Sequence, residues 1–334
     1  MSGALPPEIP QLELRDVTVR FGAGQDAPYA VDGVSLSLGR GEILGVVGES
    51  GSGKSQLLRA VMRLPPREAR LGGTMLWRGR DLATLGEREM RAVRGGEIAL
   101  ITQDAATALN RVLTVGAQID ESLAAHTVLD RRQRRARATE LLELVGIRDA
   151  ARRLDDHPHQ FSGGMLQRVM IAIALASEPG LLLADEPTTA LDVTVQEEIL
   201  RLLLSLRDRL GMSIVLVTHD LGVVARLCER VVVMYSGRVV ESCSVTALFA
   251  APRHPYTRAL LASMPGEAPP RTRLAAIEGT TPSIGDRPAG CAFHPRCVAA
   301  RPFCAITVPP LEEQVPDHQA ACLRQRDLAD RVAA

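Results

Sequence analysis

The sequence lacks any uninterrupted apolar run of the roughly 18 residues that a membrane-spanning helix needs. Its opening, MSGALPPEIPQLEL, also lacks the basic segment followed by an apolar stretch that marks a secretory signal. We therefore expect a cytosolic chain that does not span the membrane.

An excess of one charge is missing as well, because Lys plus Arg and Asp plus Glu both number 39. No global basic field therefore indicates nucleic acid as a partner. The basic run at 131–137 is interpreted as a solvated helix face.

Cysteine is scarce, with six residues in 334, and four of the six crowd into the last segment. In a reducing cytosol such a cluster indicates a metal or metal-cluster site before it indicates disulfides. The four are Cys291, Cys297, Cys304 and Cys322.

The length of 334 residues predicts one main α/β domain with insertions or a smaller appended region. Strand-like alternation dominates the opening, and from about 114 to 176 the periodicity turns helical. Strand and helix patterns then alternate again up to about 237. Beyond about 250 the composition shifts to Pro, Arg and Cys, so we expect a small extension with little core of its own.

The segment GESGSGKS at 48–55 matches G-x-x-x-x-G-K-[ST] between a strand pattern and a helix pattern. In this motif the glycines let the backbone wrap a phosphate, Lys54 reaches the outer phosphates and Ser55 can bind Mg²⁺. A plain glycine turn is the alternative, but such a turn has no need of Lys-Ser at this offset. The predicted nucleotide-binding residues are Gly48, Glu49, Ser50, Gly51, Ser52, Gly53, Lys54, Ser55 and Gln56.

A second half of the site is predicted in LLLADEP at 181–187, an apolar strand that ends in two carboxylates. Asp185 would hold Mg²⁺ through water, and Glu186 would polarise the attacking water. A solvated strand end is the alternative for this pair taken alone. Together the two motifs make nucleotide hydrolysis the leading interpretation.

At this point the chain resembles the ATP-binding subunits of ABC transporters, since FSGGMLQR at 161–168 looks like their signature motif. The resemblance implies a P-loop NTPase (RecA-like) core with a β-rich N-terminal subdomain, an inserted helical subdomain at about 104–178 and a Cys-containing C-terminal extension. The ATPase domain would span 11–250 and the extension 251–334.

The resemblance also assigns roles to single residues. Gln103 matches the Q-loop glutamine, a catalytic residue that also contacts Mg²⁺, and His219 matches the switch histidine. Residues 189–192 match the D-loop, in which Asp192 contacts the partner ATPase. Taken singly, the glutamine, the histidine and the SGGM segment also fit a surface residue, a structural histidine and an ordinary helix N-cap. The signature residues are Ser162, Gly163, Gly164 and Met165.

The family mechanism implies that two such ATPase chains sandwich two ATP molecules, each P-loop facing the partner's signature. This chain has one P-loop and one signature, so a second ATPase chain, identical or paralogous, is implied. An aromatic residue ahead of the P-loop would stack on adenine. Phe21 matches that place and Tyr29 is a second candidate, although either side chain also fits core packing.

The tail resembles that of dipeptide and oligopeptide importers, through APRHPYTRALLASMP at 251–265 and GCAFHPRC at 290–297. In some of these subunits the tail cysteines hold an iron–sulfur cluster, and all four positions are matched here. Four thiolates suit [4Fe–4S] and structural Zn²⁺ alike. The resemblance favours [4Fe–4S], with Zn²⁺ or unligated thiols as alternatives.

The sequence departs from the family pattern at the Q-loop, where QDAATALNR has Ala105 and Arg111 in place of prolines. Contacts with a permease would differ at that loop. Met165 replaces the glutamine of the general signature, as is ordinary among peptide importers.

The predicted function is ATP hydrolysis that energises uptake of di- or oligopeptides or related small solutes. Implied partners are a second ATPase, two membrane permeases and, indirectly, an extracytoplasmic solute-binding protein, at the cytoplasmic face of the membrane. A soluble ABC-type ATPase acting on DNA or ribosomes is the alternative. The sequence disfavours it, because a long coiled-coil insertion and a tandem ATPase domain are absent.

Overall fold

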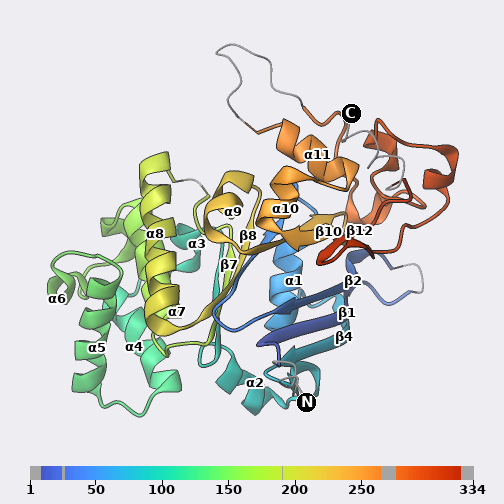
Figure 1. Ribbon diagram of the computed structural model, residues 1–334. Helices are drawn as coiled ribbons and strands as arrows, with labels where there is room; N and C mark the ends of the chain where they lie inside the picture. Colours follow the sequence, from blue (N-terminus) through green and yellow to red (C-terminus); the bar gives the residue numbers. More distant parts are fainter. Residues whose placement is uncertain (1–8, 25–26, 190, 265–275, 325–334) are drawn as a thin grey trace, which may run out of the picture. The chain divides into compact units, whose positions relative to one another are not determined.

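The computed structural model describes residues 9–24, 27–189, 191–264 and 276–324. These residues form two compact units. The helical unit contains the described residues of 9–11, 38–42 and 81–216, and the P-loop unit contains those of 12–37, 43–80 and 217–324. The helices and several of the strands of both units are labelled in Figure 1.

The strands of the helical unit follow the order β8-β7-β6. They are β6 (Ile98–Ile101), β7 (Leu181–Asp185) and β8 (Ser213–Thr218), and β6 pairs in parallel with β7. Every residue of β7 and β8 is buried, which explains their nearly continuous apolar sequences, since strands covered on both faces have no polar side to present.

The helices of this unit gather around α7, which contacts α3, α4, α5, α8 and β6. Their ends follow local chemistry: Asp130 and Gln133 form a capping box at α5, and Gly211 closes α8 in the left-handed conformation. The predicted helical segment is thereby confirmed. The helices are α2 (Glu87–Val93), α3 (Ala105–Ala108), α4 (Val115–His126), α5 (Arg131–Leu144), α6 (Ala150–Arg153), α7 (Gly163–Ala174) and α8 (Val193–Leu210).

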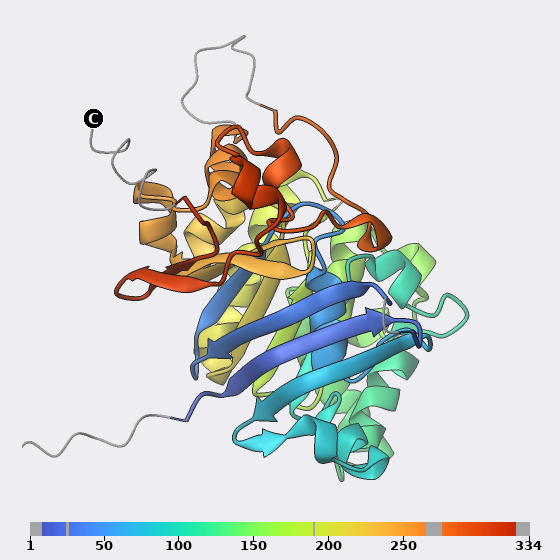
Figure 2. The same cartoon turned by 90° about the vertical axis from the view of Figure 1, so that its right-hand side faces the viewer.

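The P-loop unit contains an antiparallel sheet in the order β2-β1-β4-β5, whose three long strands lie side by side in Figure 2. These are β2 (Tyr29–Leu38), β1 (Leu12–Phe21) and β4 (Ala69–Trp77), followed by the short β5 (Arg80–Asp81). The alternation of buried and exposed side chains along β1 is typical of a strand with one face on the core. The expected β-rich opening is confirmed.

A second group of strands in this unit has the order β11-β12-β10-β9-β3. β3 (Ile43–Val47) pairs in parallel with β9 (Arg230–Tyr235), and β9 turns back antiparallel into β10 (Arg238–Ser244). The strands β11 (Glu312–Val315) and β12 (His318–Ala320) come from the C-terminal extension. Since β12 pairs with β10, the extension lengthens this sheet at its edge.

The helices of the P-loop unit are short: α1 (Lys54–Val61), α9 (Leu221–Leu227), α10 (Val245–Ala250) and α11 (Pro255–Ala262). Helix α1 ends before the predicted stop at Pro65, because Arg63 turns into the left-handed conformation with φ 50°. None of the helices in the described ranges is long and apolar enough to cross a membrane.

Aromatic packing ties the extension to the P-loop unit. The ring of Tyr235, at the end of β9, lies 4.7 Å from that of Tyr256 on α11 and 5.2 Å from that of Phe293. The Tyr256 and Phe293 rings are 5.3 Å apart, and all three side chains are buried. Edge-to-face pairs at these separations are favourable beyond the area that they bury, so this cluster supplies the extension with its core.

Candidate functional site

The glycine-rich loop 48–55 connects β3 to α1, as the sequence predicts. Gly53 caps α1 in the left-handed conformation with φ 97°, and a Cβ there would lie 2.3 Å from the carbonyl oxygen of Ala30. Only glycine fits that position without moving backbone. The loop thus leads into the N-terminal end of α1, where the first backbone amide groups of the helix favour binding of an anion.

Lys54 is buried, with 5% of its surface exposed, and its ammonium group points back into the loop. Its Nζ donates to the carbonyl oxygens of Gly48 at 2.7 Å and Glu49 at 2.9 Å. A third contact, to Ser52 Oγ, is 3.3 Å long. The carbonyl oxygens of the loop backbone therefore orient the Lys54 ammonium group within the loop, as a phosphate-binding lysine requires.

The remaining loop residues differ in exposure. Ser50 and Gly51 are exposed, Ser52 is fully buried, and Ser55 and Gln56 are partly buried on the first turn of α1. Glu49 is partly buried, and its side chain is engaged by residues of the extension instead of projecting into solvent. The loop therefore offers backbone amides, one ammonium group and one hydroxyl for a phosphate and its cation.

The other predicted residues of the P-loop unit are His219, Phe21 and Tyr29. His219 is exposed, directly after β8. Phe21 ends β1 and Tyr29 begins β2, and both are partly buried. The guanidinium of Arg20 lies over the Tyr29 ring, 5.2 Å from its centroid, so one face of this ring already has a cationic neighbour.

In the helical unit, two carboxylates follow the buried strand β7. Asp185 is 6% exposed, and Glu186 is partly buried with a φ of 47°. The left-handed region is unfavourable for a residue with a Cβ, and such strain concentrates at functional sites. Glu186 Oε2 accepts a hydrogen bond from Thr189 Oγ1 at 2.7 Å and one from Gln103 Nε2 at 3.4 Å. The structure thus brings together Gln103 and Glu186, two of the predicted catalytic residues, and adds Thr189.

The signature segment forms the start of α7, where Ser162 caps the helix by accepting from the Met165 amide at 3.4 Å. Gly164 faces α8, because a Cβ there would lie 2.4 Å from Cγ1 of Val195. At Gly163 a Cβ would meet only Leu191 Cδ2 at an ordinary 3.7 Å. Asp192 caps α8 through the Val195 amide, while Ala190 of the predicted D-loop lies outside the described residues.

The four cysteines of the tail line one pocket with Pro255, Phe293 and Leu323. Burial raises the pKa of the Cys291 and Cys297 thiols, and it raises the pKa of Cys322 to about 11. Thiols with a raised pKa ionise readily only when a metal binds, because the cation compensates the buried thiolate charge. The donor set and its apolar surroundings fit either a [4Fe–4S] cluster or Zn²⁺.

Glu241, Cys243 and His318 form another buried group, with potential ligand atoms within 4.8 Å of one another. The Glu241 carboxylate already accepts from the amides of Arg253 at 2.6 Å and His254 at 2.8 Å, and it contacts His318 Nε2 at 2.7 Å. Burial alone would raise the pKa of Glu241, but these hydrogen bonds hold it below its usual value. The group therefore joins the extension to β10 and needs no ion to explain it.

A phosphate loop, an aspartate–glutamate strand end and a serine-capped Gly-Gly helix on one chain define an ATPase of the ABC class. In keeping with this, the chain matches the family model for ABC transporters over residues 31–189, and the model for the oligopeptide/dipeptide transporter C-terminal region over residues 240–304.

Curated relatives agree over nearly the whole chain. It is 48% identical to a probable peptide ABC transporter ATP-binding protein of Sinorhizobium fredii, over 96% of each chain. It is 47% identical to the dipeptide transport ATP-binding protein DppD of Escherichia coli, over 96% of this chain and 98% of the relative. The chain therefore belongs to the family of ATP-binding subunits of peptide ABC transporters, and it is an ATPase.

Solved structures agree with this assignment. A dimeric ATP-binding cassette in a post-hydrolysis state, bound to ADP and Pi, is 31% identical with a TM-score of 0.63, covering 70% of this chain and 98% of that chain. The cbiO1 protein of Clostridium perfringens is 27% identical with the same TM-score, covering 73% and 92%. The predicted fold class and ATPase activity are confirmed.

Sequence reasoning missed two kinds of partner. It assigned no role to Thr189 beside Glu186, although the residue lies within the quoted D-loop stretch. It also overlooked Tyr256, Thr281 and Arg296, which contact Glu49 of the P-loop from the extension. Two of these residues stand in the quoted tail motifs, but a motif does not show what its side chains touch.

Proposed function

We propose that this chain hydrolyses ATP to energise import of di- or oligopeptides or related small solutes. The observation that carries the proposal is the family-specific C-terminal region at 240–304, on the same chain as the ABC transporter match. The relatives named as peptide and dipeptide transport proteins are similar over more than nine-tenths of this chain, which supports the same solute class.

The partners that we propose are a second ABC ATPase of paralogous sequence, two membrane permeases and, indirectly, an extracytoplasmic solute-binding protein. The chain would act peripherally, at the cytoplasmic face of the membrane. The presence of one P-loop and one signature in this chain supports a second ATPase, because two complete ATP sites need two chains. The dimeric cassette among the solved relatives is consistent with such a pair.

The ATP-binding role is proposed for the whole of residues 48–56. Loop amides and Lys54 would hold the phosphates, while Ser55, Gln103 and Asp185 would hold Mg²⁺, which neutralises developing charge on the phosphates when it is bound. Support comes from the α1 amides at the loop and from Lys54 Nζ, which the carbonyl oxygens of Gly48 and Glu49 hold at 2.7 and 2.9 Å.

Glu186 is proposed as the group that polarises the attacking water, with Gln103 and His219 orienting water and γ-phosphate. The Thr189 hydroxyl donates to Glu186 Oε2 at 2.7 Å and so helps to fix the position of the carboxylate that would act on water. Ser162 to Met165 would bind the ATP held by the partner chain, and Asp192 would contact that chain. Tyr29 or Phe21 would stack on adenine.

For the cysteine pocket we propose a [4Fe–4S] cluster held by Cys291, Cys297, Cys304 and Cys322, with Zn²⁺ as the alternative. Anaerobically purified protein should contain iron and absorb broadly near about 400 nm, as expected for such clusters. The Cys291→Ser variant should lose both signals. Zinc in place of iron would favour the alternative, and absence of both metals would contradict the proposal.

The test of the main proposal is the Glu186→Gln variant in the complex with its permeases. It should bind ATP and hold a closed ATPase dimer, while turnover falls by about 10²-fold or more, because the group acting on water is lost. Turnover near that of the wild type would show that Glu186 does not polarise the attacking water. Salt-sensitive binding to DNA or ribosomes, with no co-purifying permease, would instead favour the nucleic-acid alternative.

A further inference from the structure

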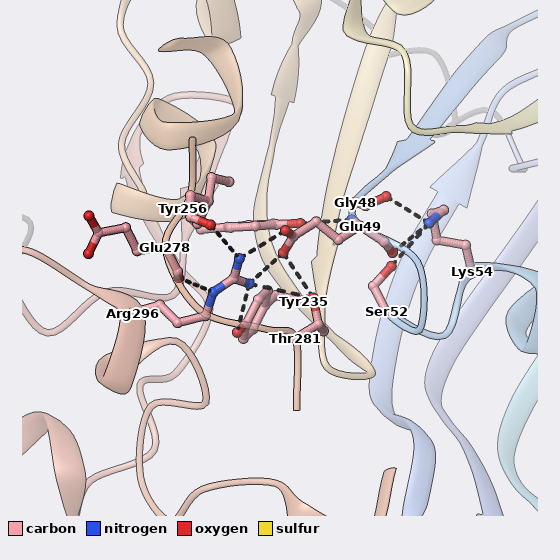
Figure 3. A network of polar contacts seen from close by, with 10 residues as sticks. Gly48, Glu49, Ser52, Lys54, Tyr235, Tyr256, Glu278, Thr281 and Arg296 are labelled. Atoms are coloured by element: carbon pink, nitrogen blue, oxygen red, sulfur yellow. Dashed lines mark hydrogen bonds and ion pairs between the residues drawn. The ribbon is translucent and has the colours of Figure 1, made fainter. Parts of the chain in front are cut away.

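Glu49 of the P-loop is held by an arginine from the C-terminal extension, as Figure 3 shows. Arg296 Nη1 lies 2.6 Å from Glu49 Oε2, and Arg296 Nη2 lies 2.9 Å from Oε1. The arginine side chain is 6% exposed and the glutamate side chain 27% exposed. A bidentate pair with so little access to water fixes both the position and the plane of the carboxylate.

The extension also holds the backbone of Glu49. The Glu49 amide donates to Tyr256 Oη at 2.8 Å, and Thr281 Oγ1 donates to Glu49 Oε2 at 3.0 Å. Burial alone would raise the pKa of Glu49, but the hydrogen bonds from Arg296 and Thr281 hold it below its usual value. Glu49 therefore stays charged, with its amide and both carboxylate oxygens engaged by the extension.

The remaining polar group of Glu49, its carbonyl oxygen, faces the other way. It accepts from Lys54 Nζ at 2.9 Å, next to the Gly48 carbonyl at 2.7 Å. A continuous set of polar contacts therefore runs from Arg296 through Glu49 to the lysine of the phosphate loop (Figure 3). Movement of Glu49 would change the direction in which the ammonium group is presented.

Arg296 is itself held in place. Its Nε donates to the Glu278 carbonyl at 2.9 Å, and its guanidinium carbon lies 5.9 Å from the centroid of Tyr235 and 6.0 Å from that of Phe293. Its neighbour Cys297 lines the cysteine pocket. These contacts fix the Arg296 guanidinium within the core of the extension, so its position relative to the loop is defined.

We propose that Arg296 is a positioning residue for nucleotide binding, acting through Glu49 to hold the P-loop in its phosphate-binding shape. The inference rests on the proposed function, in which residues 48–56 bind ATP. It gives the C-terminal extension a direct part in the ATP site. A purely structural arginine would stabilise the fold and leave nucleotide affinity unchanged.

The test is isothermal titration calorimetry of MgATP with the full-length chain. Arg296→Gln should weaken MgATP binding about tenfold, because the interaction energy between two residues in direct contact typically corresponds to about that factor in an equilibrium constant. Arg296→Lys should restore part of the affinity, since an ammonium keeps the charge but not the bidentate fork. The matched control is Arg301→Gln, which removes an exposed arginine of the same extension and should bind like the wild type.

Glu49→Gln completes the cycle. It should weaken binding by itself, and the double variant Glu49→Gln/Arg296→Gln should bind no worse than the weaker single variant. In the assembled transporter, Arg296→Gln should raise the KM for ATP by a similar factor and leave kcat within about twofold.

Unchanged MgATP affinity in a folded Arg296→Gln protein, or additive losses in the cycle, would overturn the inference. If Arg296→Gln does not fold, the affinities of Arg296→Lys and Glu49→Gln decide in the same way. The Lys54→Ala variant distinguishes failure of the positioning role of Arg296 from failure of the proposed ATP-binding function of the loop. Loss of binding in Lys54→Ala with wild-type binding in Arg296→Gln would reject the positioning role alone, whereas wild-type binding in Lys54→Ala would reject the loop's proposed function and this inference with it.

Discussion

Replacing Gly164 by alanine should push helices α7 and α8 apart. A Cβ at Gly164 would lie 2.4 Å from Val195 Cγ1, about 1 Å closer than the separation at which two carbon atoms attract each other. Val195 stands in the first turn of α8, which Asp192 caps. Relief of the overlap requires a new Val195 rotamer or a shift of the signature segment away from the D-loop.

The expected loss of stability follows from two opposing effects. Overpacking of this kind costs about 1–3 kcal/mol. Alanine in place of glycine returns at most about 1 kcal/mol of helix propensity. The free energy of unfolding should therefore fall by about 1–2 kcal/mol. ATPase activity should fall by about 10²-fold in the assembled transporter, because a displacement near 1 Å already has that effect on a positioned group.

The assay is urea denaturation followed by circular dichroism, with Gly163→Ala as the matched control. Its Cβ meets only Leu191 Cδ2 at 3.7 Å, so its stability should equal or exceed that of the wild type. Val195→Ala removes the atom in conflict, so the double variant should regain about 1 kcal/mol relative to additivity. Equal stability of the two alanine variants, or strict additivity with Val195→Ala, would refute the packing argument.

Two further changes test contacts that the sequence did not reveal. Thr189→Val removes the hydroxyl that donates to Glu186 Oε2 at 2.7 Å, so kcat of the assembled transporter should fall about tenfold while MgATP affinity stays unchanged; loss of affinity instead would place Thr189 in binding. Glu241→Gln should lower the free energy of unfolding by about 3 kcal/mol at pH 7, since it neutralises a buried, hydrogen-bonded carboxylate. Because the folded pKa of Glu241 is lowered, the wild type holds this advantage above the ordinary pKa and loses it as the pH falls through the folded value. Urea titrations at several pH values should show the two proteins converging in acid, and a constant difference would contradict the assignment.

Much of the fold was predictable because its signals are local. The buried strands β7 and β8 are nearly continuous apolar runs, and helix α8 carries its start in Asp192 and its end in Gly211. Strand β4 was not predicted individually, since its sequence ARLGGTMLW combines two glycines with little alternation. Its pairing with β1 decides its conformation, and that pairing joins residues far apart in the sequence, from Phe21↔Ala69 to Leu12↔Trp77.

The candidate site was predictable in its motifs but not in its contacts. Residue types at fixed spacing identify the phosphate loop because phosphate chemistry requires them there. The left-handed backbone of Glu186 has no sequence signal, because glutamate rarely adopts it and only the surrounding structure enforces it. The tail strands β11 (Glu312–Val315) and β12 (His318–Ala320) were missed for a related reason. Both are short, and their conformation depends on pairing: β12 pairs with the edge of β10, and β11 pairs with β12.

Glu49 shows why motif membership and role need to be separated. The loop pattern leaves its position open to any residue, so a glutamate is not required there for contact with phosphate, and its side chain would repel phosphate if it faced the ligand. The structure resolves this conflict by turning the carboxylate to Arg296, whose guanidinium compensates the charge and leaves only the backbone of Glu49 to serve the loop. A negative charge inside a phosphate loop is therefore tolerable in this chain because the C-terminal extension is present, and removal of Arg296 should harm nucleotide binding more than removal of Glu49.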